Sequence, residues 1–571
     1  MTLPNRRIQV CLIGILLLGA ATSPARAQSD AIRLQQAFER IDAFLAQSMD
    51  QQRTPGLALA ITNREGLLRV ATYGFGDLKS RAPVRPDTLF EIGSISKSFT
   101  AIALLQVKEE GKFDLQAPVT KYLPWFQISS AFEPITGHHL LSHTAGIPRD
   151  RDDMPASRMM AAALRDRATG YAPGKKFAYS NIGYQVLGYL LEDLTEQSYG
   201  ELIRRRIFER VGMTSSEPII RHETRRRLAV GYTTLYDDRP AHRSHPVVEA
   251  TWLEHDAGDG SIAATPADLA AYLRMLLNRG AVPGGRILAE ESFQLLIQRA
   301  ISQGENSWYG YGMGSSDEDG HKIISHAGGM VGYSSMLKGD LDTGLGVIVF
   351  INGPGSAGAV ADFALKTVRA ALECKELPAM PASDPARISN ASDYAGGFAG
   401  IGKRLLLTAQ GDSLWLNYAG AKIQLERRGR DQFYVGHPDF VLFLLRFERE
   451  KPAAGQKDGR VSQAFHGAEW FANEHYTGGR NFQFPKEWLS YAGHYRSHSP
   501  WLSNFRIGLL KGKLWIFYSG GGQFPLVPAE AGSFQIGEDE TAERIRFETV
   551  LNGQALRAVL SGWEFFRSAA P

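Results

Sequence analysis

The sequence predicts a mixed α/β (α+β) domain, in which helices flank an antiparallel sheet and a helical insertion divides it, followed by two small antiparallel β-barrels. Within residues 28–378, strand patterns stand at both ends and a mainly helical block lies between them. After residue 390 the helical pattern largely stops, and short strand patterns recur at intervals of roughly 8–12 residues. The 571 residues also exceed what one hydrophobic core normally holds.

The strand patterns of the first domain, 28–378, fall into two groups that are distant in the chain. They cover residues 56–61 and 67–73 early, and 322–325, 333–337 and 344–351 late. Helical spacing covers 31–50 before the first group and 359–373 after the second. Because a sheet needs other elements to cover its faces, we expect one divided antiparallel sheet with the helical block at 94–300 inserted.

The tail of the chain carries an internal repeat. A linker is predicted at 379–390, which contains proline and serine and lacks apolar periodicity. Beyond it, Tyr394–Phe398 is similar to Tyr491–Tyr495, at a spacing of about 97 residues. Copies of this length are too long for solenoid repeats. We therefore expect one β-barrel at 391–480 and a second at 485–571, with aromatic residues in their cores.

The first 27 residues have the pattern of a secretory signal peptide. Arg6 and Arg7 precede an apolar run of about 14 residues, shorter than the ~20 that a membrane-spanning helix needs. Ala25-Arg26-Ala27 fits a small-x-small cleavage site. We expect an exported, periplasmic or secreted protein with no membrane span after cleavage.

Charge and cysteine content narrow the range of partners. The formal net charge is +3, and the three arginines of residues 1–27 account for it, so the exported protein would be neutral. A neutral chain gives no electrostatic attraction for nucleic acid or for an anionic membrane. Cys374 would be its only cysteine, so no internal disulfide is expected. The expected partner is a small-molecule substrate.

The strongest local motif is Ser94-Ile95-Ser96-Lys97, at the start of an apolar helical pattern. Positions i and i+3 share a face of a helix, so Lys97 is expected one turn from Ser94. A lysine held against a serine can accept the hydroxyl proton and activate the serine as a nucleophile. A second match, Ser335 to Lys338, lies in a predicted strand where these positions point to opposite faces, so we do not expect a site there.

Tyr179-Ser180-Asn181 is the second motif. It follows a Pro-Gly pair and precedes an amphipathic helix, so it is expected in an exposed loop. A phenol near a lysine can relay a proton, and a carboxamide can bind a substrate amide through both its donor and its acceptor. Taken alone, the motif is more often a loop tyrosine that packs on the domain surface.

The third motif is His326-Ala327-Gly328-Gly329, on the strand that is expected to open the late β region. Glycines let a substrate backbone approach a strand edge closely. This strand is expected to bind substrate by β-type pairing, while the Gly329 N–H joins that of Ser94 in an oxyanion hole. A lone histidine on a strand is more often structural.

In this order and spacing, the three motifs resemble those of the serine β-lactamase and penicillin-binding-protein superfamily. They are most similar to its class C-like branch of β-lactamases, DD-peptidases, D-aminopeptidases and carboxylesterases. The resemblance covers about residues 30–375, with lesser likenesses at Leu141–Gly146 and Gly258–Leu269. It implies a β-lactamase-like fold and a serine hydrolase that forms an acyl-enzyme on Ser94. It also implies roles for the motif residues: catalysis by Ser94, Lys97 and Tyr179, and substrate binding by Asn181, His326, Ala327 and Gly328.

One residue departs from the β-lactamase pattern. His326 stands where β-lactamases usually carry a lysine that binds the substrate carboxylate, and neutral imidazole is a poorer anion site. A catalytic domain followed by two similar barrels also resembles the D-aminopeptidase architecture. The expected substrate is therefore a D-amino-acid-containing peptide or amide, as for a D-aminopeptidase or DD-peptidase. A carboxylesterase or weak β-lactamase at the same site is the alternative, and an inactive small-ligand-binding module is the non-enzymatic one.

Other chemistries lack their motifs in this sequence. There is no Gly-x-Ser-x-Gly elbow and no P-loop that ends in Gly-Lys-Ser or Gly-Lys-Thr. His139 and His143 have a zinc-type i, i+4 spacing but no attendant glutamate. We expect neither a metal nor a cofactor.

Overall fold

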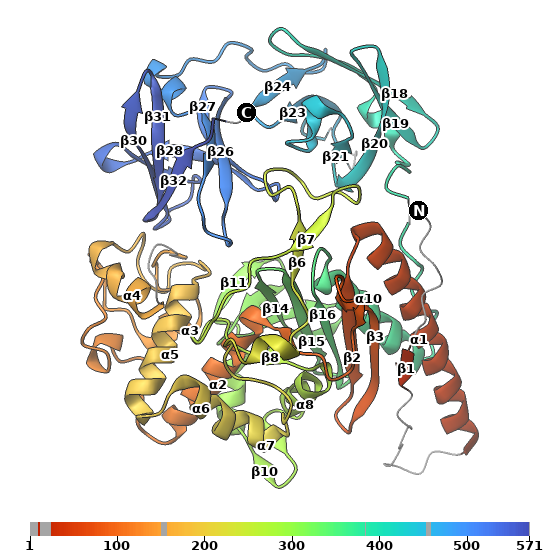
Figure 1. The fold of residues 1–571 in the computed structure, drawn as a ribbon, viewed down its shortest axis with the longest axis vertical. Helices are drawn as coiled ribbons and strands as arrows, with labels where there is room; N and C mark the ends of the chain where they lie inside the picture. The colour runs from red at the N-terminus through yellow and green to blue at the C-terminus, as the bar shows by residue number, and fades with distance from the viewer. Residues whose placement is uncertain (1–8, 12–23, 150–156, 383, 453–457, 570–571) are drawn as a thin grey trace. The chain divides into compact units, whose positions relative to one another are not determined.

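A computed structural model describes residues 9–11, 24–149, 157–382, 384–452 and 458–569 (Figure 1). The chain forms two compact units. The first unit holds the described residues up to Thr234 and from Val247 to Pro381. The second holds residues 235–246 and the described residues from Ala382 onward, and we call it the barrel unit.

The first unit is organised around one antiparallel sheet with the strand order β1-β3-β2-β16-β15-β14-β13-β12-β11. The strands are β1 (Gln9–Cys11), β2 (Gly56–Thr62), β3 (Leu67–Asp77), β11 (Ile301–Gly304), β12 (Ser307–Tyr309), β13 (Gly314–Glu318), β14 (His321–Met330), β15 (Tyr333–Asp340) and β16 (Leu345–Ile351), and β4 (Ala82–Pro83) pairs with β3. Strand β2 from the beginning of the unit pairs with β16 from its end. The predicted divided antiparallel sheet is therefore confirmed.

Three strands of the late β region, β11, β12 and β13, are not among the predicted ones. They are short, and β11 (Ile-Ser-Gln-Gly) and β13 (Gly-Ser-Ser-Asp-Glu) are too polar to show apolar alternation. Their register comes from pairing with β14 instead. The expectation that the strand of His326 opens the late β region is thus wrong, because β14 is the fourth strand of that region.

Two long helices cover one face of the sheet. Helices α1 (Pro24–Gln52) and α10 (Ala357–Leu372) lie side by side (Figure 1), and the rings of Phe44 and Phe363 stack between them at 4.3 Å. The leucines and isoleucine of β2 pack under these helices, whereas its alternating alanines face the other core. Burial on both faces explains why this strand is a continuous apolar run.

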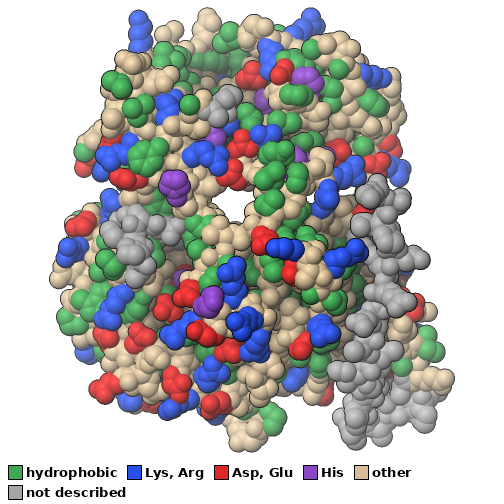
Figure 2. Space-filling view, viewed as in Figure 1, with side chains coloured by type: hydrophobic (Ala, Val, Ile, Leu, Met, Phe, Trp, Pro, Cys, Tyr) green, Lys and Arg blue, Asp and Glu red, His purple; other side chains and the backbone are tan. Residues whose placement is uncertain are grey.

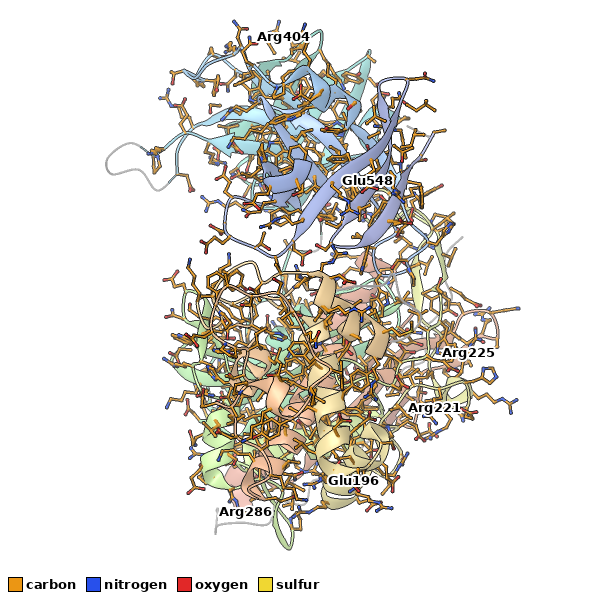
Figure 3. All side chains as sticks on the ribbon, turned by 90° about the vertical axis from the view of Figure 1, so that its left-hand side faces the viewer. Glu196, Arg221, Arg225, Arg286, Arg404 and Glu548 are labelled. Atoms are coloured by element: carbon orange, nitrogen blue, oxygen red, sulfur yellow. The ribbon has the colours of Figure 1, made fainter. Side chains whose placement is uncertain are left out.

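The helical block covers the opposite face. Its helices are α2 (Ser96–Glu109), α3 (Gly137–Leu141), α4 (Ser157–Ala162), α5 (Asn181–Thr195), α6 (Tyr199–Ile203), α7 (Glu209–Val211), α8 (Pro266–Leu277) and α9 (Glu290–Leu296), with the short strands β5 (Phe90–Glu91), β6 (Tyr232–Thr234), β7 (Val247–Glu249), β8 (Ala263–Ala264), β9 (Ala281–Val282) and β10 (Gly285–Arg286). Helix α2 is buried from Ser96 to Val107 and is therefore central. Helix α5 ends at Thr195, and the next residue, Glu196, has a left-handed backbone; Glu196 is labelled in Figure 3.

The barrel unit contains the two predicted barrels, and both are closed. The first comprises β17 (Gly396–Ala399), β18 (Arg404–Gln410), β19 (Ser413–Tyr418), β20 (Ala421–Gly429), β21 (Gln432–Val435), β22 (Leu445–Arg449), β23 (Val461–His466) and β24 (Glu469–Ala472). The second comprises β25 (Gly493–Arg496), β26 (Asn504–Leu510), β27 (Lys513–Tyr518), β28 (Gln523–Pro528), β29 (Ser533–Ile536), β30 (Arg544–Leu551), β31 (Gln554–Leu560) and β32 (Trp563–Arg567). Buried aromatics such as Phe433 and Phe565 fill the cores, as predicted. Glu548 on β30 pairs with Arg557 on β31 (Figure 3).

Residues 235–246, between β6 and β7, belong to the barrel unit although the first unit surrounds them in the sequence. We call this segment the tongue tip. The ring of its His242 stacks on Tyr434 of the first barrel at 4.1 Å. Its Asp237 accepts a hydrogen bond from Arg496 of the second barrel at 2.5 Å. The tongue tip therefore contacts both barrels.

In the part of the chain that the structure describes, no helix has the length and apolar character that a membrane span requires. Most of the predicted signal peptide, 1–27, lies outside the described residues. On the face that Figure 2 shows, Lys and Arg side chains are interspersed with Asp and Glu. This face carries no large patch of a single sign, in keeping with the small net charge.

Candidate active site

Ser94 lies in a 3₁₀ turn, Gly93–Ile95, that leads from β5 into α2. Within residues 89–107 it is the one residue that is not buried. Gly93 has a φ of +51°, and a Cβ atom there would lie 2.5 Å from the Gly329 carbonyl oxygen. Both facts require glycine, because a side chain would be strained and would collide with β14. The turn therefore leaves the Ser94 side chain accessible, while the residues on either side of it are buried.

Lys97 is fully buried beneath Ser94, as the Ser-x-x-Lys spacing predicts. Its Nζ donates to Ser94 Oγ at 3.0 Å, to Asn181 Oδ1 at 2.7 Å and to the Asp259 carbonyl oxygen at 2.7 Å. Three acceptors match the three N–H groups of an ammonium. In the neutral amine, the two shorter contacts would take the two remaining N–H groups and direct the lone pair at Ser94. The geometry thus suits a lysine that exchanges a proton with this serine.

The Tyr-Ser-Asn motif meets the same lysine. Asn181 is the first residue of α5, and the Oγ of Ser180 caps this helix by accepting the Gly183 N–H at 3.2 Å. Capping fixes the direction in which the Asn181 carboxamide leaves the helix. The centroid of the Tyr179 ring lies 4.9 Å from Lys97 Nζ. The structure therefore brings the first two predicted motifs together.

Strand β14 places the third motif against the turn of Ser94. A Cβ atom on Gly328 would lie 1.9 Å from the Ile92 carbonyl oxygen, so only glycine allows this approach. Strand β13 pairs with β14 only up to Ser325, and residues 326–330 pair with β15 on their other side. Ala327 and Gly329 are exposed. Among the described strands, none pairs with this edge beyond Ser325, which leaves it accessible to an extended substrate.

The His326 side chain points into the protein and is only 6% exposed. Its Nε2 lies 2.9 Å from the Tyr309 hydroxyl, and its Nδ1 lies 2.7 Å from the Ala327 carbonyl oxygen. Burial and the charge of Lys97 lower the pKa of His326 to about 4. The imidazole is therefore neutral, with Nδ1–H donating to the carbonyl and Nε2 accepting from the phenol. The protein itself engages both ring nitrogens.

His143 holds the loop that contains Tyr179 in place, and none of the three motifs predicts this role. It is buried, its Nδ1 accepts the Ser180 N–H at 3.0 Å, and its ring lies 4.2 Å from the ring of Tyr179. Its carbonyl oxygen accepts the Ala178 N–H at 2.8 Å. Burial, together with the charge of Lys97, holds the pKa of His143 well below its ordinary value. Its only signal in the sequence is the lesser likeness at 141–146.

The segment 258–262 holds helix α2 in place, and none of the three motifs predicts this role. The carbonyl oxygen of Gly258 accepts from Thr100 Oγ1 at 2.6 Å, and that of Asp259 accepts from Lys97. The Ile262 N–H donates to Ser96 Oγ at 3.1 Å. This segment therefore runs along the first turns of α2 and binds them through its backbone. Backbone groups make these contacts, so side-chain motifs do not reveal the segment. The lesser likeness at 258–269 is its only signal in the sequence.

The second Ser-x-x-Lys match is not a site, as predicted. Ser335 Oγ donates to the Ile92 carbonyl oxygen at 2.8 Å, whereas Lys338 Nζ donates to Glu318 and Asp362. The two side chains lie on opposite faces of β15. Ser335 instead helps to hold β15 against the turn of Ser94.

One group of ligand-type side chains lies apart from this site. Among the described residues, His321, Asp340 and Asp342 bring side-chain ligand atoms within 4.8 Å of one another. However, Arg369 Nη1 lies 3.2 Å from Asp340 Oδ2, so a guanidinium already balances this carboxylate. The arrangement is that of an ion-pair network at the start of β14.

Comparison with known proteins identifies the family. The β-lactamase family model matches residues 41–371. The chain is similar to protein flp of Staphylococcus aureus (24% identity, covering 55% of this chain and 63% of that protein). It is also similar to penicillin-binding protein 4* of Bacillus subtilis (27%, covering 47% and 61%) and to penicillin-binding protein 4 of Amycolatopsis lactamdurans (28%, covering 55% and 84%). The chain thus spans less than two thirds of the length of the first two.

The fold has a similar solved structure, an octameric penicillin-binding protein homologue from Pyrococcus abyssi. The two share 25% identity with a TM-score of 0.57, over 76% of this chain and all of the other. The family match covers more than half of the chain and all three motifs. This chain belongs to the β-lactamase family, within the serine β-lactamase and penicillin-binding-protein superfamily.

Proposed function

We propose that the protein hydrolyses an amide or peptide bond in a D-amino-acid-containing peptide or amide, through an acyl-enzyme on Ser94. The observation that carries this proposal is the state of His326. A neutral imidazole, bound to Tyr309 and to the Ala327 carbonyl, occupies the position where β-lactamases carry an ammonium. A substrate without a carboxylate at that position suits the site best. The two closed barrels after the domain, an arrangement similar to that of D-aminopeptidases, support the same substrate class.

The proposed reaction follows from the contacts of Lys97. Ser94 Oγ attacks the carbonyl carbon while Lys97 Nζ, 3.0 Å away, accepts the hydroxyl proton. The backbone N–H groups of Ser94 and Gly329 stabilise the oxyanion, since the Gly93 turn and Gly329 are in close contact. Collapse of the tetrahedral intermediate breaks the C–N bond, and the amine leaves with a proton relayed through Tyr179 and Lys97. Water then attacks the ester, which releases the acid and restores the Ser94 hydroxyl.

Substrate would lie along the open edge of β14. Ala327 and Gly329 are exposed there, while His326 and Gly328 are buried. An extended substrate can form β-type hydrogen bonds with this edge, and its scissile carbonyl would then face Ser94. The Asn181 carboxamide, anchored to Lys97 through Oδ1, borders the same space. We further propose that the protein is exported with removal of residues 1–27, which N-terminal sequencing of the exported form would test.

A substrate panel tests the proposal. The panel comprises D-aminoacyl amides, D-Ala-D-Ala peptides, short-chain esters and cephalosporins, each assayed with the wild type and with Ser94→Ala. We expect the highest kcat/KM for D-aminoacyl amides or peptides and no turnover by the variant. Faster hydrolysis of cephalosporins would overturn the substrate assignment, and preference for esters would favour a carboxylesterase. Absence of turnover and of labelling at Ser94 would favour a small-ligand-binding module.

A further inference from the structure

A buried ion pair lies directly behind Lys97. His255 Nε2 is 3.0 Å from Asp259 Oδ1, and the two side chains are 18% and 9% exposed. Burial works against the charge of each, yet the Asp259 carboxylate holds the pKa of His255 above its ordinary value. The imidazolium in turn holds the pKa of Asp259 below its ordinary value. Both groups therefore carry charge near pH 6.5.

The pair closes a backbone loop whose carbonyl oxygen binds Lys97. At one end of this loop, the N–H and the carbonyl of His255 both bond to Ile220 at 2.9 Å. At the other end, Gly258 packs so closely on α5 that a Cβ atom there would lie 2.8 Å from the Tyr184 carbonyl oxygen. The Asp259 carbonyl oxygen then lies 2.7 Å from Lys97 Nζ. The side chain of Asp259 thus fixes the residue whose own backbone orients the lysine.

Among the residues that the structure describes, few other charged groups lie near this ion pair. The titratable groups that face the pair are Lys97 from α2, Glu91 from β5, Tyr189 from α5, Tyr199 from α6 and Asp256 from the same loop. Burial raises the pKa of Glu91 to about 8, that of Tyr189 to about 12, and that of Tyr199 as well. These three groups are therefore neutral at pH 7, and Asp256 is exposed to solvent. The buried charges next to Lys97 are those of His255 and Asp259.

We infer that His255 and Asp259 are positioning residues, which hold the Asp259 carbonyl on Lys97 and set the pH range in which Lys97 accepts the Ser94 proton. The inference rests on the proposed function, because it requires Lys97 to act as the base. In the pair, the imidazolium offsets the field of the carboxylate at Lys97. Without His255, the lone carboxylate favours the ammonium form of Lys97, which cannot accept a proton. Without Asp259, burial returns His255 to the neutral imidazole, so neither charge of the pair then acts on Lys97.

The test measures the rate at which a fluorophosphonate probe modifies Ser94 as a function of pH, in the full-length protein. The probe does not titrate, so the acidic limb of the profile reports the base. We expect His255→Gln, which leaves a lone carboxylate, to move this limb to higher pH by about one unit, and Asp259→Asn, in which neither charge remains, to leave it within about 0.3 unit of the wild type while lowering the rate. The double variant should return to within about 0.3 unit of the wild type, since both charges are then absent. Glu91→Gln, which removes a buried carboxyl without contacting Lys97, should leave the limb in place.

A merely structural role would lower the rate in every variant and leave the acidic limb in place. No shift in a His255→Gln variant that keeps the wild-type unfolding temperature, or an equal upward shift in the double variant, would overturn the inference. If His255→Gln fails to fold, His255→Asn takes its place, and the double variant is again the matched control. Failure of the proposed function looks different, because the wild type itself would then not be labelled at Ser94.

Discussion

Gly328 lies so close to Ile92 that a Cβ atom on residue 328 would be 1.9 Å from the Ile92 carbonyl oxygen. This contact seats the substrate strand against the turn of the candidate nucleophile. The neighbouring Gly329 has no atom within 4 Å of a Cβ atom. Gly328 is therefore required because a side chain would collide with the turn of Ser94. Gly329 has room for a side chain, and its glycine leaves the strand edge open to substrate.

Gly328→Ala should displace β14 from the turn of Ser94. Overpacking of this kind costs about 1–3 kcal/mol of unfolding free energy, and a displacement near 1 Å costs about 10²-fold in rate. Denaturant unfolding and probe labelling of Ser94 measure the two effects. Gly329→Ala is the matched control for stability and should unfold like the wild type. Equal unfolding free energies for wild type and Gly328→Ala would contradict the packing argument.

Lys97→Ala and Tyr179→Phe should each lower kcat by about 10²–10⁴, because positioned acid–base groups contribute that much. Lys97 Nζ lies 4.9 Å from the centroid of the Tyr179 ring, so we expect both side chains to serve one proton path. The double variant should therefore lose far less than the product of the two single effects. A double-mutant cycle on kcat measures this. Simple additivity would indicate independent, structural roles.

Protonation of His326 should destabilise the fold in acid. Its pKa is about 4 in the folded protein against 6.5 ordinarily, so between these values the unfolded chain binds more protons. Stability then rises with pH through this window, and the neutral ring costs up to about 3 kcal/mol as pH falls from 6.5 to 4. Denaturant unfolding at several pH values tests this. His326→Gln should make the dependence between pH 4 and 6.5 shallower, while His139 and His143, whose pKa values are also lowered, keep part of it. An unchanged slope would contradict the assignment.

The first unit should keep a reactive Ser94 without the barrels, because all its described site contacts lie within that unit. The truncated protein should extend to Pro381, since Arg40 donates to the Pro378 carbonyl and Gln47 to the Pro381 carbonyl. We expect residues 28–381 to be labelled by a small fluorophosphonate. The tongue tip 235–246 would lose its barrel contacts there, so its replacement by a short glycine linker is the matched variant. Loss of labelling in a folded truncated protein would show that the barrels complete the site.

The local geometry of the three motifs could be predicted from the sequence, because each motif is a short pattern of side chains with a known structural meaning. The Ser94–Lys97 spacing gives the helical contact directly, and the Pro-Gly pair before Tyr179 gives its loop. His143 and Asp259 are harder to predict, since they act through contacts that only the tertiary structure creates.

The fold shows the same division. The apolar strands β2 and β16 and the repeated barrels carry strong periodic signals, so the divided sheet and the tail could be predicted. Strands β11 and β13 are polar and short, and pairing with neighbours forms them. The tongue tip has no periodicity, and its assignment to the barrel unit depends on contacts such as that between His242 and Tyr434.

The site of covalent modification tests most directly whether Ser94 is the nucleophile. The protein is incubated with a D-aminoacyl amide or a fluorophosphonate, quenched in acid, digested and analysed by mass spectrometry. If Ser94 is the nucleophile, we expect a mass increase on the peptide that contains it. A folded Ser94→Ala variant should show neither adduct nor turnover. Wild-type-like turnover by Ser94→Ala, or an adduct confined to another residue, would contradict this role of Ser94.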